Sequence, residues 1–149
     1  RVLFRSEGIF GSRYEFYDNL FGRQLRIGKP NDDRSATVSI PVELHGHGDE
    51  AGVGFTFDYD PSLLSGPRIV LDEALGEGVT LTVNDTTSGH VVVLIDSVRR
   101  FERPTLANRL VTLTFDRIAD YFDATAKTQF GRITNANASD EHGNVLVIR

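Results

Sequence analysis

Apolar and polar residues alternate in a series of short runs along this chain, from Arg23 onward. The clearest run covers 36–44, and its apolar members at every second position are Val38, Ile40, Val42 and Leu44. A period of two is that of a β-strand with one buried side. Pro41 lies in the same run and has no N–H to donate to a sheet. We therefore expect this strand to lie at a sheet edge or to carry a bulge near Pro41.

Two further runs show the same alternation. We expect 53–60 to bury Val53, Phe55, Phe57 and Tyr59, and 79–83 to bury Val79, Leu81 and Val83. After the turn residues of 60–62, Leu63 and Leu64 are expected to point back toward the core. The remaining strand candidates are 23–28, 68–71, 90–96, 109–115, 127–134 and 144–149.

About nine short strands with frequent turn signals predict an all-β fold, a sandwich of two antiparallel sheets. Only 118–127 has helical spacing, and the residues that carry it are Ile118, Tyr121, Phe122 and Thr125. Two interpretations stay open for this segment: a single helical turn, or the end of a strand followed by a loop. At most one short helical turn is expected.

The two ends of the chain differ from its body. Residues 1–6, RVLFRS, resemble the translation of a sequencing-adapter end, and we interpret them as non-native. Residues 7–22 are expected to be a linker or the end of a preceding unit, and 23–149 to form the domain. Because the chain contains no Met, even at position 1, we expect it to be a metagenomic fragment of a longer reading frame whose signal peptide lies outside it.

Composition fits one globular domain of 149 residues, 40% hydrophobic and 25% charged. The net charge is −5, and it becomes −7 without Arg1 and Arg5. The basic residues form no stripe, which argues against nucleic acid as a partner. No run has the ~20 apolar residues of a membrane span, so membrane insertion is not expected. The absence of Cys excludes disulfides and thiol catalysis.

The segment 45–50, HGHGDE, places four metal-binding residue types together: His45, His47, Asp49 and Glu50. Zinc sites use such residues, but glycines on both sides of His47 would leave the ligands on a pliable loop. The composition is that of a turn between a strand ending at Leu44 and one beginning near Val53. We favour a solvated loop over a metal site.

No other segment assembles a recognisable reaction centre. His90 and His142 have no predictable partner, and there is no nucleophile elbow or phosphate-binding loop. Several carboxylates end strands and are expected to be solvated caps; these are Asp58, Asp60, Asp96 and Asp116. The segments NDDRS and SDEHGN lack the spacing of an EF-hand and read as turns. The sequence therefore predicts no enzyme, no cofactor and no metal.

The segment 38–64 resembles the early part of bacterial cohesin domains. There a V-x-V-P-V-x-L strand, a Gly-containing loop and an F-x-F-x-Y-D-P-x-x-L strand follow one another. The matching residues here are Val38, Ile40, Pro41, Val42, Leu44, Phe55, Phe57, Tyr59, Asp60, Pro61 and Leu64. The segments VTLTVNDTTSGHVVVLIDS, LVTLTF and SDEHGN also resemble this family, so that the resemblance spans 23–149.

The resemblance implies a nine-stranded jelly-roll sandwich without catalytic activity. Cohesins bind dockerin modules outside the cell or at its surface and assemble enzymes of polysaccharide degradation, with calcium held by the dockerin. The chain departs from the family in the longer, aromatic segment 118–127. It also departs at its end, where the closing strand is expected to be incomplete.

The resemblance further implies that a partner docks on the sheet of the third, fifth, sixth and eighth strands. Alternation along 90–96 points Val92 and Leu94 outward, and two outward aliphatic residues are unusual on a solvated sheet. The neighbouring outward positions are predicted to be Thr56, Asp58, Thr80 and Thr82. The alternative is that the loop 99–104 covers this face through Phe101.

Two other functions stay open at this stage. Sandwich domains that bind carbohydrate stack sugars on rows of Trp or Tyr, but this chain has no Trp, and its four Tyr form no strip. The second of these functions is that of a structural spacer domain without a ligand of its own. We expect a dockerin-like protein module or a polysaccharide as partner.

Overall fold

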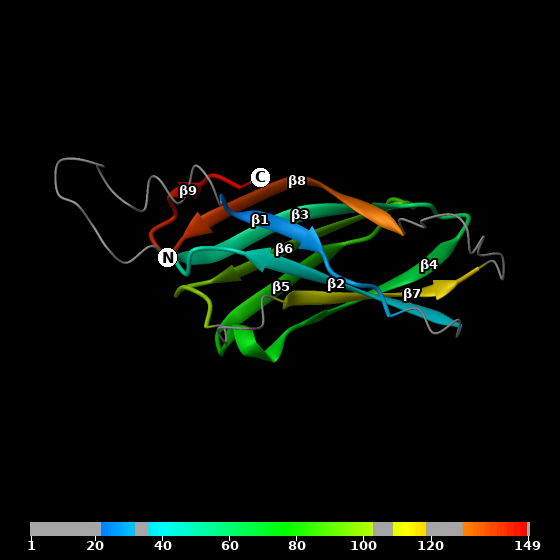
Figure 1. Cartoon of the computed structure of the whole chain (residues 1–149), viewed down its shortest axis with the longest axis horizontal. Coiled ribbons are helices and arrows are strands. Elements are labelled where there is room, and N and C mark those ends of the chain that lie inside the picture. The colour runs from blue at the N-terminus through cyan, green and yellow to red at the C-terminus, as the bar shows by residue number, and fades with distance from the viewer. Residues whose placement is uncertain (1–21, 32–35, 103–108, 119–129, 149) are drawn as a thin grey trace.

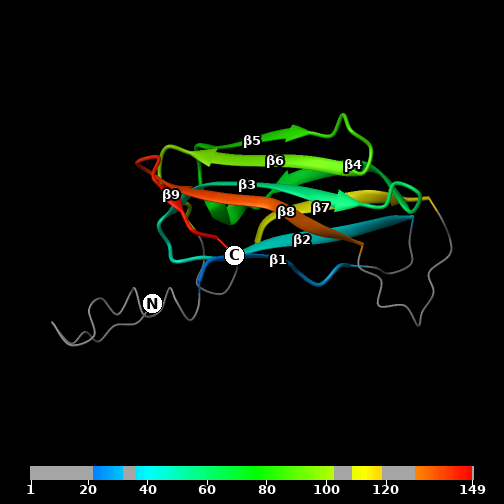
Figure 2. The ribbon, with the colours of Figure 1, turned by 90° about the horizontal axis from the view of Figure 1, so that it is seen from above.

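The computed structural model describes residues 22–31, 36–102, 109–118 and 130–148 of the chain. These residues form nine strands in two layered sheets (Figures 1 and 2). The predicted all-β antiparallel sandwich is therefore confirmed. The interpretations of residues 1–6 and 7–21, and of a helical turn within 119–127, fall outside the described residues.

The first sheet has four strands in the order β1-β2-β7-β4. Their bounds are Gln24–Ile27 for β1, Thr37–His45 for β2, Arg109–Arg117 for β7 and Leu64–Leu71 for β4. Every neighbouring pair is antiparallel.

The second sheet has five strands in the order β5-β6-β3-β8-β9. Their bounds are Val79–Asn84 for β5, His90–Ser97 for β6, Glu50–Tyr59 for β3, Gly131–Asp140 for β8 and Val145–Leu146 for β9. All of its pairs are antiparallel as well. A short 3₁₀ turn, Glu73–Leu75, begins at Asp72, whose carboxylate accepts a hydrogen bond from the Ala74 N–H at 2.9 Å.

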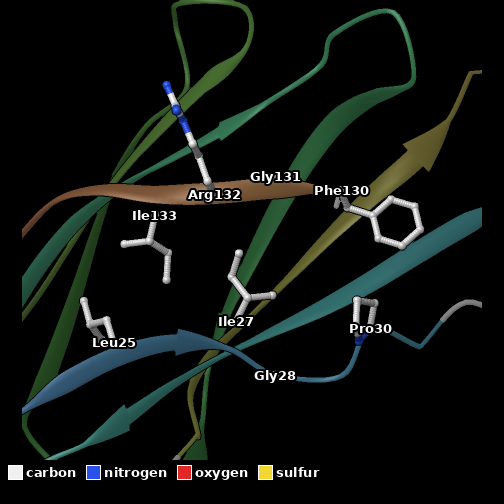
Figure 3. Close-up of a pocket in the computed structure, with 8 residues that line it drawn as sticks. All are labelled: Leu25, Ile27, Gly28, Pro30, Phe130, Gly131, Arg132 and Ile133. Atoms are coloured by element: carbon white, nitrogen blue, oxygen red, sulfur yellow. The ribbon is translucent and has the colours of Figure 1, made fainter. Parts of the chain in front are cut away.

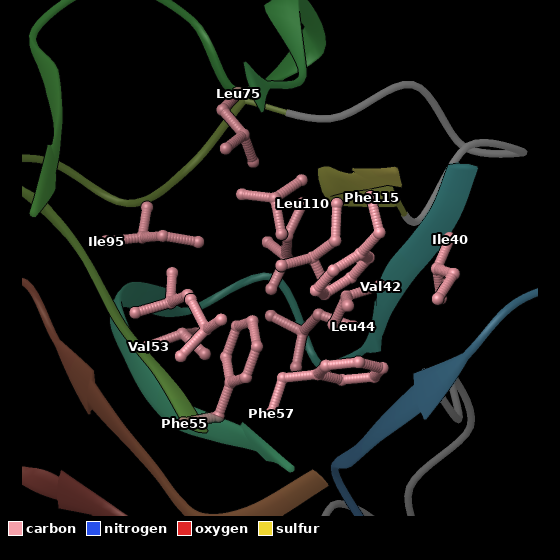
Figure 4. Close-up of a cluster of buried hydrophobic side chains, with 14 of the residues drawn as sticks. Ile40, Val42, Leu44, Val53, Phe55, Phe57, Leu75, Ile95, Leu110 and Phe115 are labelled. Carbon is pink, nitrogen blue, oxygen red and sulfur yellow. The ribbon is translucent and has the colours of Figure 1, made fainter. Parts of the chain in front are cut away.

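The core fills the space between the sheets (Figure 4). Alternate residues of β2 and of β3 point into it, as predicted, and Leu64 is buried beside the half-buried Leu63. Tyr59 is half-buried, and its ring centroid lies 4.8 Å from that of Phe115. Burial of these aliphatic and aromatic side chains on both sheets holds the layers together.

The expectation for Pro41 was half right. β2 is an inner strand, between β1 and β7, so the edge alternative is wrong. The register shift between Val42 and Glu43 confirms the bulge. The Pro41 carbonyl accepts a hydrogen bond from the Gly28 N–H, just beyond the end of β1 at Ile27. The N–H and C=O of one residue in an antiparallel strand point the same way. The nitrogen of Pro41, which has no hydrogen to donate, therefore faces the point where β1 ends.

Three strand predictions need correction. β5 is an edge strand, so Val79 and Leu81 are only half-buried and Val83 is exposed. The strand expected at 127–134 is observed as Gly131–Asp140, with 127–129 outside the described residues. The strand expected at 144–149 pairs with β8 only at Val145–Leu146.

Candidate binding surface on the five-stranded sheet

The outer face of the five-stranded sheet is built by strand register. Val92 on β6 lies opposite Thr56 on β3, and Leu94 lies opposite Gly54. On the other side of β6, Asn84 of β5 pairs with Val92, and Thr82 of β5 pairs with Leu94. β8 extends both rows beyond β3, with Thr134 next to Thr56 and Asn137 next to Gly54. We call these eight residues the outer patch.

Val92 and Leu94 form the apolar centre of the outer patch. Their exposed fractions are 45% and 47%, although each side chain lies in the middle of a sheet. Phe101 does not cover them, because it is buried in the core between the sheets. The alternative that Phe101 hides this face is therefore wrong, and two exposed aliphatic side chains remain at the centre of a polar surface.

The rim of the outer patch consists of hydroxyl and amide groups. Thr82, Asn84 and Asn137 are exposed, and Thr56 and Thr134 are half-buried. A Cβ atom at Gly54 would fall 2.9 Å from the Asn137 Oδ1, so that the absence of a side chain at Gly54 lets Asn137 lie over β3 toward Leu94. Such groups can exchange hydrogen bonds with water for hydrogen bonds with a partner.

A polar cluster closes one end of the face. The imidazole Nδ1 of His90 lies 2.6 Å from the Asp58 Oδ1, and the Thr134 hydroxyl donates to Asp58 Oδ2 at 2.9 Å. Arg132 reaches the same carboxylate at 3.9 Å. The hydrogen bond with His90, and after it that from Thr134, lowers the pKa of Asp58 against the opposing effect of burial.

The opposite end of the face is also polar. Thr80 on β5 donates from its hydroxyl to the backbone carbonyl of Asp96 at 3.2 Å. Asp96 is exposed and pairs across the sheet with Gly52. All six residues predicted for the partner surface, Thr56, Asp58, Thr80, Thr82, Val92 and Leu94, therefore share this face. Four residues of the outer patch were missed: Gly54, Asn84, Thr134 and Asn137. Thr134 and Asn137 were missed because the register of β8 on β3 does not follow from periodicity, and Asn84 lies just beyond the strand predicted at 79–83.

The 45–50 segment has a different arrangement from the solvated loop that was expected. Glu50 begins β3 and is only 1% exposed, so its assignment to a solvated loop is wrong. Its carboxylate accepts hydrogen bonds from the backbone N–H groups of His47 and Gly48, at 2.8 and 3.0 Å. The Arg23 Nε donates to the same carboxylate at 2.7 Å. The loop thus folds around an internal carboxylate.

Asp49 joins this cluster from the surface side. Both of its carboxylate oxygens accept from Arg23 Nη2, at 2.9 and 2.7 Å. Burial alone would raise the pKa of Asp49, but the hydrogen bonds and charge of Arg23 outweigh that effect and lower it. Within the described ranges, no three His, Asp or Glu side chains come together as a metal site would require.

The other carboxylates singled out in the sequence have local roles. Asp60 accepts from the backbone and hydroxyl of Ser62 in the turn after β3. Asp116 pairs with Arg68 across β7 and β4 at 3.0 Å. Asp140 caps its turn by accepting from the backbone N–H groups of His142 and Asn144. No helix in the described part of the chain has the length and apolar character of a membrane span.

The chain matches no protein-family model and no curated protein sequence. Solved structures do resemble it. One is the non-cellulosomal cohesin of the archaeon Archaeoglobus fulgidus, with a TM-score of 0.61 and 12% identity over 85% of this chain and 83% of that one. Another is a cohesin module from a Clostridium perfringens family 33 glycoside hydrolase, with a TM-score of 0.59 and 16% identity over 85% and 90%.

A third is the sixth cohesin of scaffoldin B from Acetivibrio cellulolyticus, determined in complex with a dockerin. Its TM-score is 0.62, with 19% identity over 85% of this chain and 92% of that one. These likenesses show that the described sandwich has the cohesin fold.

Proposed function

We propose that this domain is a non-catalytic protein-binding module whose partner docks on the outer patch of the five-stranded sheet. The observation that carries the proposal is the exposure of Val92 and Leu94 at the centre of that sheet. An apolar centre within a rim of hydroxyl and amide groups has the anatomy of a protein interface.

The outer patch suits a protein partner better than a reacting substrate. It is formed by neighbouring strands that present side chains in rows across the sheet. The described carboxylates at its two ends have hydrogen-bond partners: Asp58 with His90 and Thr134, and Asp96 with the Ser97 N–H. Docking would bury the two aliphatic side chains, which stabilises a complex by roughly 25 cal/mol for each Å² of apolar surface removed from water.

The finer proposal is that the partner is a dockerin-type module and that the domain belongs to a secreted or surface protein linked to polysaccharide degradation. Support comes from the sequence resemblance to cohesins and from the shared fold. It comes also from a neighbour that was solved in complex with a dockerin and another that belongs to a glycoside hydrolase.

The experiment is a binding assay on the full chain against a panel of immobilised dockerin modules, the Acetivibrio Cel5 dockerin among them. The test variant is Leu94→Asp, which places a charge at the centre of the patch. We expect at least about a tenfold loss of affinity, as for a central interface residue. Val70→Asp is the matched control, because Val70 is exposed on the four-stranded sheet and should leave binding unchanged.

A wild-type chain that binds no dockerin would contradict the dockerin-type proposal. Glycan-array binding that disappears in Leu94→Asp would favour a carbohydrate-binding domain instead. The absence of binding in both assays would favour a structural spacer domain. Equal loss in Leu94→Asp and Val70→Asp would place the interface elsewhere.

A further inference from the structure

The two margins of the sandwich are built differently. At one margin β1 and β8 border a groove of about 470 Å³, lined in part by Leu25, Ile27 and Ile133 (Figure 3). At the opposite margin each sheet ends in a single strand, β4 in the four-stranded sheet and β5 in the five-stranded sheet (Figure 2). Both strands, and the turns at their ends, lie within the continuous described range 36–102.

The edge of β4 carries features by which natural sheets avoid pairing with other chains. Pro67 has no N–H to donate, and the pairing of β4 with β7 shifts register between Ser65 and Arg68. Arg68 also adds a charge, which pairs with Asp116 at 3.0 Å. A proline, a bulge and a charged residue each discourage the addition of a strand at an edge. β4 is therefore a poor template for a further strand.

The edge of β5 has none of these features. Its six residues, VTLTVN, include no charge and no proline. Its ladder with β6 runs from Val79 to Asn84 without a register shift, and no described strand pairs with its other side. About half of the backbone N–H and C=O groups of a strand point to such an edge. β5 thus offers a regular row of hydrogen-bonding groups to another strand.

The sequence of β5 is the same in both directions about Leu81, since 79–83 reads V-T-L-T-V. If two copies of this strand meet in antiparallel order about a twofold axis at Leu81, every residue lies opposite a residue of its own type. The pairs are Leu81 with Leu81, Val79 with Val83, and Thr80 with Thr82 of the second copy. A contact between identical surfaces related by a twofold axis requires such self-complementarity.

The pairs also match in their surroundings. Val79 and Leu81 are half-buried against the core, and Val83, on the same side of β5, is 36% exposed. Thr80 and Thr82 lie on the outward side and are exposed. Residues paired across an antiparallel ladder share a face of the sheet, so the apolar pairs fall on the core side and the Thr pairs on the outward side. Aliphatic and Thr–Thr pairs of this kind stabilise a sheet.

We propose that β5 is a self-association edge through which two copies of this chain join in antiparallel register about Leu81. The two five-stranded sheets become one continuous sheet, and the dimer is closed because each copy uses its β5 edge once. The contact uses the backbone edge of β5, whereas the outer patch uses outward side chains, so the inference does not rest on the proposed function. Because the contact is short, we expect a dissociation constant of about 0.1–1 mM.

Two acidic residues flank β5: Glu77 precedes it and Asp85 follows it. In the proposed register Glu77 of one copy lies opposite Asp85 of the other, and each chain has a net charge of −5. Both effects oppose association, and salt screens both. We therefore expect the dimer to be at least about threefold tighter at about 0.5 M NaCl than at about 0.05 M.

The test is sedimentation equilibrium of the full chain from about 10 μM to about 1 mM. Hydrogen exchange is measured in dilute and in concentrated samples. We expect an equilibrium between monomer and dimer that goes no further than the dimer. At high concentration the backbone amides within 79–84 should exchange more slowly.

Charge substitutions at Thr80 and Thr82 test the register. Thr80→Lys combined with Thr82→Lys places like charges opposite each other in both pairs, and we expect at least about tenfold weaker association. Thr80→Lys combined with Thr82→Glu places opposite charges together, and it should dimerise within about threefold of the wild type. Circular dichroism checks that both variants are folded. Leu94→Asp and Val70→Asp are the controls and should dimerise as the wild type does.

Several outcomes would overturn the proposal. One is a wild-type chain that stays monomeric at about 1 mM, and another is an assembly that grows beyond the dimer. Equal association of the Lys–Lys and Lys–Glu variants would exclude the register. Loss of the dimer in Leu94→Asp would place self-association on the outer patch, and loss in Val70→Asp would place it on the four-stranded sheet. Dockerin binding is measured at micromolar chain concentrations, where the chain is monomeric, so its failure is distinguishable from failure of the dimer.

Discussion

The guanidinium of Arg23 donates a 2.7 Å hydrogen bond from Nε to the buried carboxylate of Glu50. This contact joins the residue before β1 to the first residue of β3. It also explains why the HGHGDE segment is ordered around a carboxylate instead of a cation: two backbone N–H groups and one guanidinium surround Glu50.

Replacing Arg23 by Met is expected to lower the free energy of unfolding by about 3 kcal/mol. The reason is that Glu50 would keep its burial and lose the opposite charge that compensates it. Urea denaturation monitored by circular dichroism measures the change. Arg26→Met is the control, because Arg26 is exposed on the same strand and bonds only Gln24 among described side chains. It should alter stability by no more than about 0.5 kcal/mol, and equal effects of both variants would contradict this role of Arg23.

The contact between His90 and Asp58 makes the free energy of unfolding depend on pH in the acid range. The pKa of Asp58 is lowered in the folded chain, chiefly by the hydrogen bond with His90. Its contribution to stability is therefore full above the unfolded value of about 3.9, and it is lost as pH falls through the lower folded value. His90→Ala should raise the pKa of Asp58 and make stability fall less steeply below about pH 4.

Carboxyl NMR titration and urea unfolding at a series of acid pH values test this expectation. His142→Ala is the control, because His142 lies in the turn after β8, apart from Asp58. An Asp58 titration that is unchanged in His90→Ala would show that the imidazole does not set its pKa.

Gly131 is expected to tolerate no side chain. A Cβ atom there would overlap the ring of Phe57 and the backbone carbonyl of Asp58. Phe57 is fully buried and cannot move aside without disturbing the core. Gly131→Ala should therefore destabilise the chain by about 1–3 kcal/mol in thermal or urea unfolding. Arg132→Ala, one position along, should have almost no effect, and similar values for the two variants would contradict the steric argument.

Leu94→Asp is expected to lower the free energy of unfolding by no more than about 1 kcal/mol, because the side chain is about half exposed and Asp is only moderately unfavourable in a strand. Chemical denaturation checks this. Phe55→Ala, at a buried position of the neighbouring strand, should in contrast lose about 3–5 kcal/mol. A large loss in Leu94→Asp would mean that Leu94 stabilises the fold, and the binding assay would then need a milder substitution.

Strong alternation predicted the strands that lie against the core. In Val38 to Leu44 and Val53 to Phe57, alternate apolar side chains enter the core, and this alternation appears directly in the order of residues. β8 was predicted too early because its second half, TNANASD, is rich in small and polar residues that are uncommon in strands. It forms a strand because β3 offers a partner edge, and that partner is distant in the chain.

The sequence by itself determined the class of fold and the outward direction of Val92 and Leu94, since the two-residue period of a strand assigns each side chain to a face. Only the tertiary structure decided that Phe101 enters the core, that Arg23 compensates Glu50, and that Gly54 and Asn137 complete the outer patch. Each of these depends on which distant strands and loops meet, and in what register. Local periodicity holds no information about either.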